Sequence, residues 1–452
     1  MKALNRRDFL RSSGAAALMA ATPGISYSQV VGGGGAFDDY RSLVCVFMFG
    51  GNDSYNMLVP RSDSEYGVYA ASRQNLAIPQ QDLLAITPPG QGSVEFGLHP
   101  SMSGVQSLFE SSNASFVTNV GPLIEPTSRD DYFNGSVSLP PQLFSHNDQQ
   151  DQWSSLRGTT PSKTGWAGRM ADLIRTAVSE QQMATNASLF GANLMQAADD
   201  TVAYVMGPGG PVQFEGFSLD PDSIPFQQRE AFRRVVDGQY DTVYERGFAD
   251  VQRRAIDAAD AVTAAIDSAP PINAVFPQSQ LGTQLRTVAR IIAVREQLQM
   301  ERQIFFVAAG GFDSHDNQNQ NQPGLLGGIS DAVSAFYAAS VELGVADSVT
   351  TFTQSDFSRT LTSNGDGTDH AWGGNQLVVG GAVAGRQLIG NFPSLQIGGP
   401  EDVGGGRFIP STSADQYAAT LAKWFGIPDV DLDIVAPNLS SFAQRDLGFM
   451  IA

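Results

Sequence analysis

The amino-acid sequence predicts an α/β fold in which a largely parallel sheet carries helices on both faces. Short apolar, β-rich segments alternate along the chain with longer segments of helical spacing. Such alternation is typical of a parallel sheet, and strands that read as unbroken apolar runs are buried on both faces. We find no internal repeat, and we interpret the chain as one α/β domain with a helical insertion.

Each expected element follows from local pattern and turn residues. Strands are expected at 43–49, 115–120, 304–308, 348–353 and 376–379. Helices are expected at 101–110, within 227–300, at 328–343 and at 414–425. Loops at 208–225 and 267–277 bound the insertion, which we place at about 209–277 within a domain spanning 40–452.

The first 28 residues have the layout of a signal peptide. An Arg-Arg pair at 6–7 precedes a modestly apolar stretch at 14–21, which is too short to anchor the chain in a bilayer. Small residues then stand where a signal peptidase reads the chain, so cleavage is expected before Gln29. We therefore expect export by the twin-arginine translocase to the periplasm or beyond, with 29–39 as a flexible lead-in. We expect no membrane anchor.

The charge balance is strongly acidic. The chain has 27 basic and 46 acidic residues, for a net charge of −19. Removing residues 1–28 takes away four basic residues and one acidic residue, so the mature protein carries −22. A surface of this sign disfavours nucleic acid and anionic membranes as partners. Because Cys45 is the sole cysteine, no disulfide can form within the chain.

Three of the expected strands end in the same way, with an apolar run, a short turn and an aspartate. These residues are Asp53, Asp313 and Asp356. In an open α/β sheet, ligands bind at the carboxyl ends of the strands. If the three strands are neighbours, the carboxylates converge at one edge, where a divalent metal is the usual means of holding them together.

The chain has only four histidines, each in a polar or turn-like setting. His315 and His370 are the candidates for metal binding or catalysis, with Asp369 beside His370. His146 is left open between a site role and a structural role, and His99, next to a proline, is interpreted as structural. Nitrogen and oxygen donors of this kind suit zinc, manganese or similar ions. The alternative is that all are turn and capping residues in surface loops.

Six short motifs, in order along the chain, resemble a bacterial family known as domain of unknown function 1501, whose members commonly carry twin-arginine signals. The matching stretches are 49–56 with 59–60, 98–100, 310–315, 355–360, 367–375 and 424–426, which include Gly-Gly-Phe-Asp-Ser-His and Gly-Thr-Asp-His-Ala-Trp-Gly-Gly-Asn.

That family is in turn similar to the alkaline phosphatase and sulfatase superfamily, whose enzymes use a nucleophilic Ser, Thr or modified Cys beside a metal site, usually of two ions. The resemblance implies that Asp53, Asp313, His315, Asp356 and His370 hold metal. Asp369 joins them in an alternative alignment that puts Asp369-His370 on the superfamily's Asp-His pair.

The sequence departs from the superfamily pattern at two points. Phe357 stands where a metal-binding histidine is expected after Asp356, and the spacing from Asp313 to His315 is short. Either alignment leaves the set one ligand short of two full sites. The expected cofactor is therefore a divalent ion (zinc, manganese or calcium), with one ion only, or none, left open.

The resemblance also implies a nucleophile and a residue that orients the substrate. Ser145, beside His146, is the first candidate for the nucleophile, with Thr127 and Ser128 as alternatives. Arg359 is a candidate for orienting an anionic ester group through its planar fork, although an ordinary surface salt bridge would explain it equally.

Two functions fit these residues. The first is an alkaline phosphatase- or sulfatase-like, metal-dependent hydrolase of small phosphate or sulfate esters. The second is a non-catalytic relative whose cleft binds a ligand or a periplasmic partner protein. The Asp and His residues favour the first, whereas Phe357 and the unsettled nucleophile favour the second.

Overall fold

The centre of the fold is β1 (Arg41–Met48), which lies between two parallel neighbours, β8 (Arg302–Ala309) and β9 (Val349–Ser355). The computed structural model describes residues 37–91, 94–158, 161–211, 218 and 220–451. The predicted signal peptide 1–28 lies outside these residues, as does most of the lead-in at 29–39.

The other strands of the main sheet are β5 (Ala114–Gly121), β6 (Asn186–Ser188), β7 (Tyr204–Val205), β10 (Gly374–Val379), β11 (Leu388–Ile389) and β12 (Thr412–Ser413). In the described part of the chain the order is β11-β5-β10-β9-β1-β8-β6-β7, and β12 also pairs with β5. β10 runs antiparallel to both neighbours, and the remaining pairs are parallel. The predicted, largely parallel sheet is confirmed. A second, antiparallel sheet has the order β2 (Leu58–Pro60), β4 (Phe96–Leu98), β3 (Leu84–Ile86).

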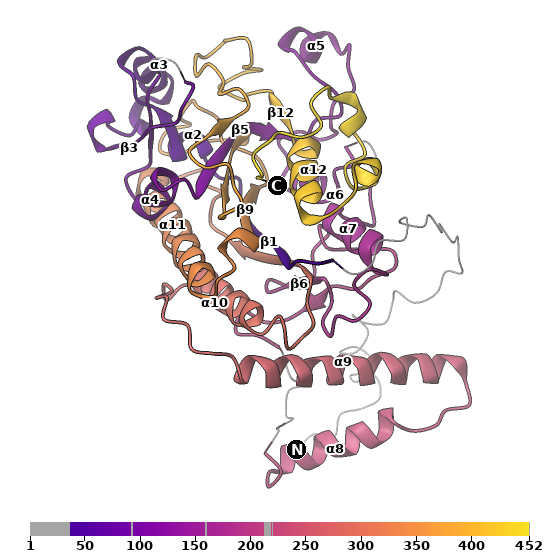
Figure 1. Cartoon of the computed structure of the whole chain (residues 1–452). Coiled ribbons are helices and arrows are strands. Elements are labelled where there is room, and N and C mark those ends of the chain that lie inside the picture. The colour runs from indigo at the N-terminus through magenta and orange to yellow at the C-terminus, as the bar shows by residue number, and fades with distance from the viewer. Residues whose placement is uncertain (1–36, 92–93, 159–160, 212–217, 219, 452) are drawn as a thin grey trace. The chain divides into compact units, whose positions relative to one another are not determined.

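Helices cover both faces of the main sheet, as Figure 1 shows. One face is packed by α4 (Ser103–Glu110), α10 (Gln280–Ala293) and α11 (Gln318–Glu342). The other is packed by α7 (Trp166–Ile174), α12 (Ala414–Phe425) and α13 (Leu432–Val435). Other helices of this unit are α2 (Ser54–Met57), α3 (Asp63–Arg73), α5 (Arg129–Asn134) and α6 (His146–Ser155). Turns of 3-10 helix lie at Gln74–Leu76, Gln80–Asp82, Ala346–Ser348, Asp429–Asp431 and Leu439–Ser441.

The side chains of β1 alternate between two cores, as successive residues of a strand must. Val44, Val46 and Met48 face α10 and α11, whereas Leu43, Cys45 and Phe47 face α7 and α12. All six are 0–1% exposed. This burial on both faces is the reason that the strand reads as an unbroken apolar run.

Several helices differ from the sequence prediction. α11 begins at Gln318, ten residues before the expected start, which was missed because the first turns are polar and contain Pro323. The helices α2, α3, α5, α6, α7 and α13 were not expected. In α6, the His-Asn-Asp-Gln-Gln start gives no apolar periodicity. By length and composition alone, α11 could cross a membrane. Its inner residues, among them Leu326, Val333 and Phe336, pack in the protein core.

Residues Val212–Ala261 form a separate compact unit, within the region where we predicted a helical insertion. It contains α8 (Ile224–Val236) and most of α9 (Val243–Asp267). Arg229 and Arg233 on α8 form ion pairs with Asp260 on α9.

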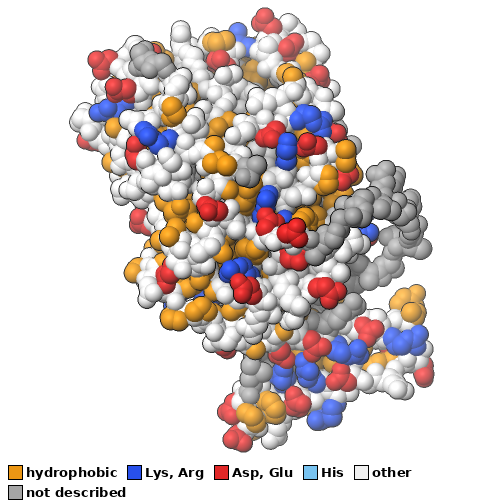
Figure 2. All heavy atoms as spheres, viewed as in Figure 1, with side chains coloured by type: hydrophobic (Ala, Val, Ile, Leu, Met, Phe, Trp, Pro, Cys, Tyr) orange, Lys and Arg blue, Asp and Glu red, His pale blue; other side chains and the backbone are white. Residues whose placement is uncertain are grey.

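Acidic side chains are scattered over the face of the molecule drawn in Figure 2, with basic ones between them.

Candidate metal centre

The fold brings the carboxyl ends of three predicted strands to one edge of the sheet. β9, β1 and β8 are adjacent and parallel, so Asp356, Asp53 and Asp313 follow them at the same edge. β10 runs the other way, so the loop before it, which carries His370, reaches this edge too. The last element at this edge is α6, which begins at His146.

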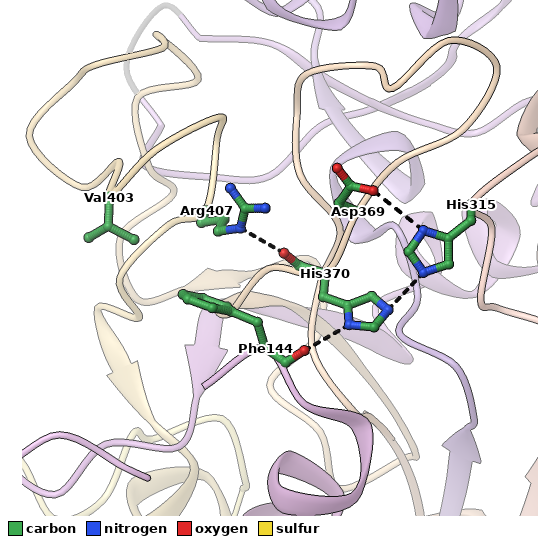
Figure 3. Close-up of a pocket in the computed structure, with 6 residues that line it drawn as sticks. All are labelled: Phe144, His315, Asp369, His370, Val403 and Arg407. Atoms are coloured by element: carbon green, nitrogen blue, oxygen red, sulfur yellow. Dashed lines mark hydrogen bonds and ion pairs between the residues drawn. The ribbon is translucent and has the colours of Figure 1, made fainter. Parts of the chain in front are cut away.

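Three imidazoles converge on one carboxylate oxygen at this edge. The Nε2 atoms of His315, His146 and His370 lie 3.2, 3.4 and 3.6 Å from Asp313 Oδ1. The Nε2 atoms of His315 and His370 are 2.8 Å apart. We call these four residues the His/Asp cluster. Figure 3 shows the side of the cluster formed by His315 and His370.

An oxygen acceptor lies beside the other ring nitrogen of each histidine. His146 Nδ1 is 2.6 Å from Asp356 Oδ2, and His370 Nδ1 is 2.7 Å from the carbonyl oxygen of Phe144. His315 Nδ1 lies 3.4 Å from Asp369 Oδ1. A carbonyl oxygen can only accept, so Nδ1 of His370 carries the proton and its Nε2 presents a lone pair. This is the arrangement of histidines that bind metal through Nε2.

The cluster passes a test of fit for a metal ion. Nε2 of His146 is buried and makes no hydrogen bond within the described part of the chain, although Asp313 Oδ1 lies 3.4 Å away. A buried polar atom of this kind costs free energy unless something satisfies it. Ligand atoms of His146, Asp313 and His370 lie within 4.8 Å of one another, close enough to share one ion.

The protonation states also suit metal binding. Burial raises the pKa of Asp313, but the Arg359 guanidinium and the nearby imidazoles more than offset this, so the net pKa is lowered. Burial lowers the pKa of His370, and the charges of His146 and Arg359 lower it further, against the opposing effect of the Phe144 carbonyl. At neutral pH the cluster therefore presents an anionic carboxylate and a neutral His370.

Arg359 is committed to the protein rather than free for a substrate. Its guanidinium is buried, pairs with Asp313 and donates to the carbonyl oxygens of Gly50, Gly51 and Thr368. The Arg359 side of this salt bridge is buried, whereas the alternative left open from the sequence was an ordinary surface pair, and the pair fixes the position of Asp313.

Phe357 forms an apolar wall of the cluster. Its buried ring stacks on His370 at 4.7 Å between centroids and lies 4.8 Å from the His146 ring. The ring packs on Gly51, where a Cβ atom would come within 2.3 Å of it. The phenylalanine that stands in the place of an expected histidine thus packs against two histidines that the fold supplies from elsewhere.

Asp53 is not brought to the His/Asp cluster. Its carboxylate is 2% exposed, pairs with buried Arg73 and accepts from the amide of Gln318. Asp356 and Asp369 lie one step behind the imidazoles, as partners of His146 and His315. Among the carboxylates proposed from sequence, Asp313 is the one at the centre of the imidazoles.

The candidate nucleophiles differ in their surroundings. Ser145 directly precedes α6, and its hydroxyl donates to Asp148 Oδ2 at 2.6 Å. Ser128 caps α5 and bonds to Asp131, and the Thr127 hydroxyl donates to the carbonyl oxygen of Glu125. Ser145 alone of the three is next in sequence to a residue of the His/Asp cluster.

Two groups that contact the site residues were not predicted from the sequence, and the role of a third, His146, was left open. The Phe144 carbonyl and the Gln150 amide, which donates to Asp356 at 2.8 Å, gave no motif signal. His146 was left open, although the Ser-x-x-Asp pattern at 145–148 is a helix-start signal that could have placed it. His99 is separate and buried: its Nδ1 accepts from Ser101 N–H, and burial lowers its pKa to about 4.

An Asp356→Asn substitution tests the positioning of His146. The amide cannot reproduce the charge that holds the Nδ1 proton, so the affinity for a divalent metal is expected to fall about 10- to 100-fold. Titration of the metal-free protein with zinc, followed by calorimetry, measures this change. An Asp151→Asn variant, which changes a carboxylate further along α6, is the control. Equal affinities for the two variants would contradict a positioning role.

No curated protein sequence matches the chain. Ps i-CgsB, solved in complex with k-i-k-neocarrahexaose, is 10% identical with a TM-score of 0.35, over 90% of this chain and 77% of that one. A Bacteroides thetaiotaomicron protein, from a locus for the metabolism of multiple glycosaminoglycans, is 10% identical with a TM-score of 0.31, over 87% and 74%.

The family comparison covers most of the chain. The sequence model described as "Protein of unknown function (DUF1501)" matches residues 40–403, a range that includes the whole His/Asp cluster. The chain therefore belongs to the DUF1501 family of proteins of unknown function.

Proposed function

We propose that this protein is an exported, metal-dependent hydrolase of phosphate or sulfate esters, with one divalent ion held by the His/Asp cluster. The observation that carries the proposal is the convergence of three Nε2 atoms on Asp313 Oδ1 at 3.2–3.6 Å, with each Nδ1 facing an oxygen acceptor. The resemblance of the family to the alkaline phosphatase and sulfatase superfamily supports the choice of ester substrate.

The donor set favours a transition metal. The ligand atoms that lie within 4.8 Å of one another are one imidazole nitrogen each of His146 and His370 and a carboxylate oxygen of Asp313. This set, with the His315 imidazole beside it, suits zinc and its neighbours, whereas calcium and magnesium prefer oxygen ligands. A bound ion would polarise an ester oxygen and stabilise the charge that develops on it. Within the proposal Asp53 is structural, and Asp356 and Asp369 position histidines rather than bind the ion.

The chain itself supplies the other parts of the reaction. The Ser145 hydroxyl donates a hydrogen bond to Asp148, so this carboxylate is placed to accept the proton as the Ser145 oxygen attacks the phosphorus or sulfur of the ester. The bond from that atom to the alcohol oxygen breaks, and the alcohol leaves with the proton from Asp148. Water would then release phosphate or sulfate from Ser145. Phe357 keeps water from one side of the imidazoles. Arg359 keeps Asp313 ionised, which preserves its ability to bind a cation.

Elemental analysis and hydrolysis assays on the purified mature protein test the proposal together. We expect about one equivalent of a transition metal, and hydrolysis of p-nitrophenyl phosphate or p-nitrophenyl sulfate that chelators abolish. Ser145→Ala should retain the metal and lose activity by at least about 100-fold. The Ser136→Ala variant, which removes an exposed hydroxyl on another loop, is the control.

The possible failures have different meanings. A metal-bound protein with no activity on either ester would leave the non-catalytic alternative, in which the site binds a ligand or a periplasmic partner protein. A folded protein that takes up no transition metal would overturn the proposal, because the His/Asp cluster would then not be a metal site.

Export through the twin-arginine translocase is the second part of the proposal. Replacing Arg6 and Arg7 together by lysine should keep nearly all of the protein in the cytoplasm, because the translocase reads the arginine pair. Cell fractionation of tagged protein measures this. Arg11→Lys, a change of the same kind outside the pair, should leave export intact, and normal export of the double variant would exclude this route.

A further inference from the structure

A pocket of about 380 Å³ adjoins the His/Asp cluster and extends beyond it. It is lined by Phe144, His315, Asp369, His370, Val403 and Arg407. In Figure 3, Val403 and His315 lie at opposite ends of this group of residues, with Arg407 and His370 between them. A molecule that fills the pocket therefore meets the imidazoles on one side and Arg407 on the other.

Arg407 is held rigidly by neutral groups. Its Nε donates to the carbonyl oxygen of His370 at 2.9 Å, and its Nη1 donates to that of Gly404 at 3.0 Å. The guanidinium lies over the Phe144 ring, 5.5 Å from the centroid. The turn that carries Arg407 is fixed by the buried carboxylate of Asp402, which accepts from several backbone N–H groups. The side chain is thus already placed before any ligand binds.

The carboxylate that lines the same pocket as Arg407, that of Asp369, lies beside His315 Nδ1 at 3.4 Å. Within the described residues no ion pair of Arg407 is found, whereas Arg73 and Arg359 each pair with an aspartate. Its Nη2 also makes no hydrogen bond in that part of the chain. A fixed, unpaired guanidinium with a free N–H edge at the wall of a pocket is a receptor for an oxyanion. In a chain of net charge −19, such a local positive site stands out.

The Phe144 backbone links this receptor to the metal centre. Phe144 adopts φ +71°, a left-handed conformation that is uncommon for a non-glycine residue. This conformation places its carbonyl oxygen on His370 Nδ1 and its ring under Arg407. Phe144 therefore contacts both His370 of the His/Asp cluster and Arg407, so the positions of these two side chains depend on the same residue.

We propose that Arg407 binds an oxyanion group of the substrate other than the ester group at the His/Asp cluster, so that preferred substrates carry at least two negative groups. The inference rests on the proposed function for the identity of the first group, but the oxyanion receptor itself does not require catalysis. Val403 and the Phe144 ring add an apolar wall beside this second group.

Binding of inorganic sulfate to the metal-free protein tests the receptor apart from the reaction. Equilibrium titration of wild type should show binding that Arg407→Gln weakens at least about tenfold. Val403→Asp, which leaves Arg407 in place and adds a negative charge to the pocket, should weaken it similarly. Arg175→Gln, which removes an exposed arginine at the end of α7, is the matched control and should bind as wild type does.

Three results would overturn the inference: no sulfate binding by wild type, equal affinity in Arg407→Gln, or an equal loss in Arg175→Gln. Zinc uptake by Arg407→Gln is measured in parallel, because Arg407 Nε in the wild type donates to the carbonyl oxygen of His370, a residue of the His/Asp cluster. If wild type takes up no metal and cleaves no ester, the proposed function fails while the sulfate titration still decides on Arg407. If it is active, Arg407→Gln should lower kcat/KM for a doubly anionic ester more than for a singly anionic one.

Discussion

A His370→Ala variant is expected to lose nearly all of its bound divalent metal, with the metal affinity reduced by more than about 100-fold. Mutation of residues that only hydrogen-bond to the ligands already lowers metal affinity about 10- to 100-fold, and removal of a ligand should lower it further. The substitution removes one of three imidazoles whose Nε2 atoms face Asp313, and His370 Nε2 is also 2.8 Å from that of His315. Elemental analysis of the folded variant and zinc titration of its metal-free form measure the effect.

The fourth histidine offers a matched control. His99 is 5% exposed, and Nδ1 accepts a hydrogen bond from Ser101. A His99→Asn variant keeps an acceptor near that position and should retain wild-type metal content. Equal metal content in the His370→Ala variant and wild type would show that the imidazoles meet for a structural reason alone.

An Asp53→Asn variant is expected to lower the free energy of unfolding by about 3–5 kcal/mol, since breaking a buried ion pair leaves an uncompensated charge. Arg73 is fully buried and would lose its anionic partner, with the Thr360 carbonyl as a remaining acceptor. Urea denaturation measures the change. Asp429→Asn, which breaks an exposed pair with Lys423, should change stability little.

The metal content of folded Asp53→Asn separates two roles for this residue. The structure surrounds Asp53 with Arg73, Gln318 and Gln322, so the variant should bind metal as wild type does. Loss of metal with unchanged stability would instead restore the role that the superfamily resemblance implies for Asp53.

Much of the fold was predictable because its signals are local. The apolar runs at 43–49, 304–308 and 348–353 became β1, β8 and β9, since strands buried on both faces must be apolar throughout. α6 was not predicted, because its first turn carries polar site residues and its sequence therefore lacks the apolar periodicity that indicates a helix.

In the candidate site, too, contacts between residues close in sequence were predictable and contacts between distant residues were not. Asp313 and His315 are two residues apart, so the sequence by itself determined that they would lie together at the end of a strand. The approach of His146 to Asp356, 210 residues away, and of Phe144 to His370, 226 residues away, followed only from the order of the strands and the return of β10.

The three strand-ending aspartates show what each level contributes. Composition and spacing determined an acidic α/β chain with aspartates after three buried strands, because strand burial and turn chemistry are written in neighbouring residues. Only the tertiary structure decided their different surroundings: arginine and glutamine around Asp53, a histidine on Asp356, and three imidazoles with an arginine around Asp313. The partner of a carboxylate is selected by packing between distant segments, and no local pattern records that choice.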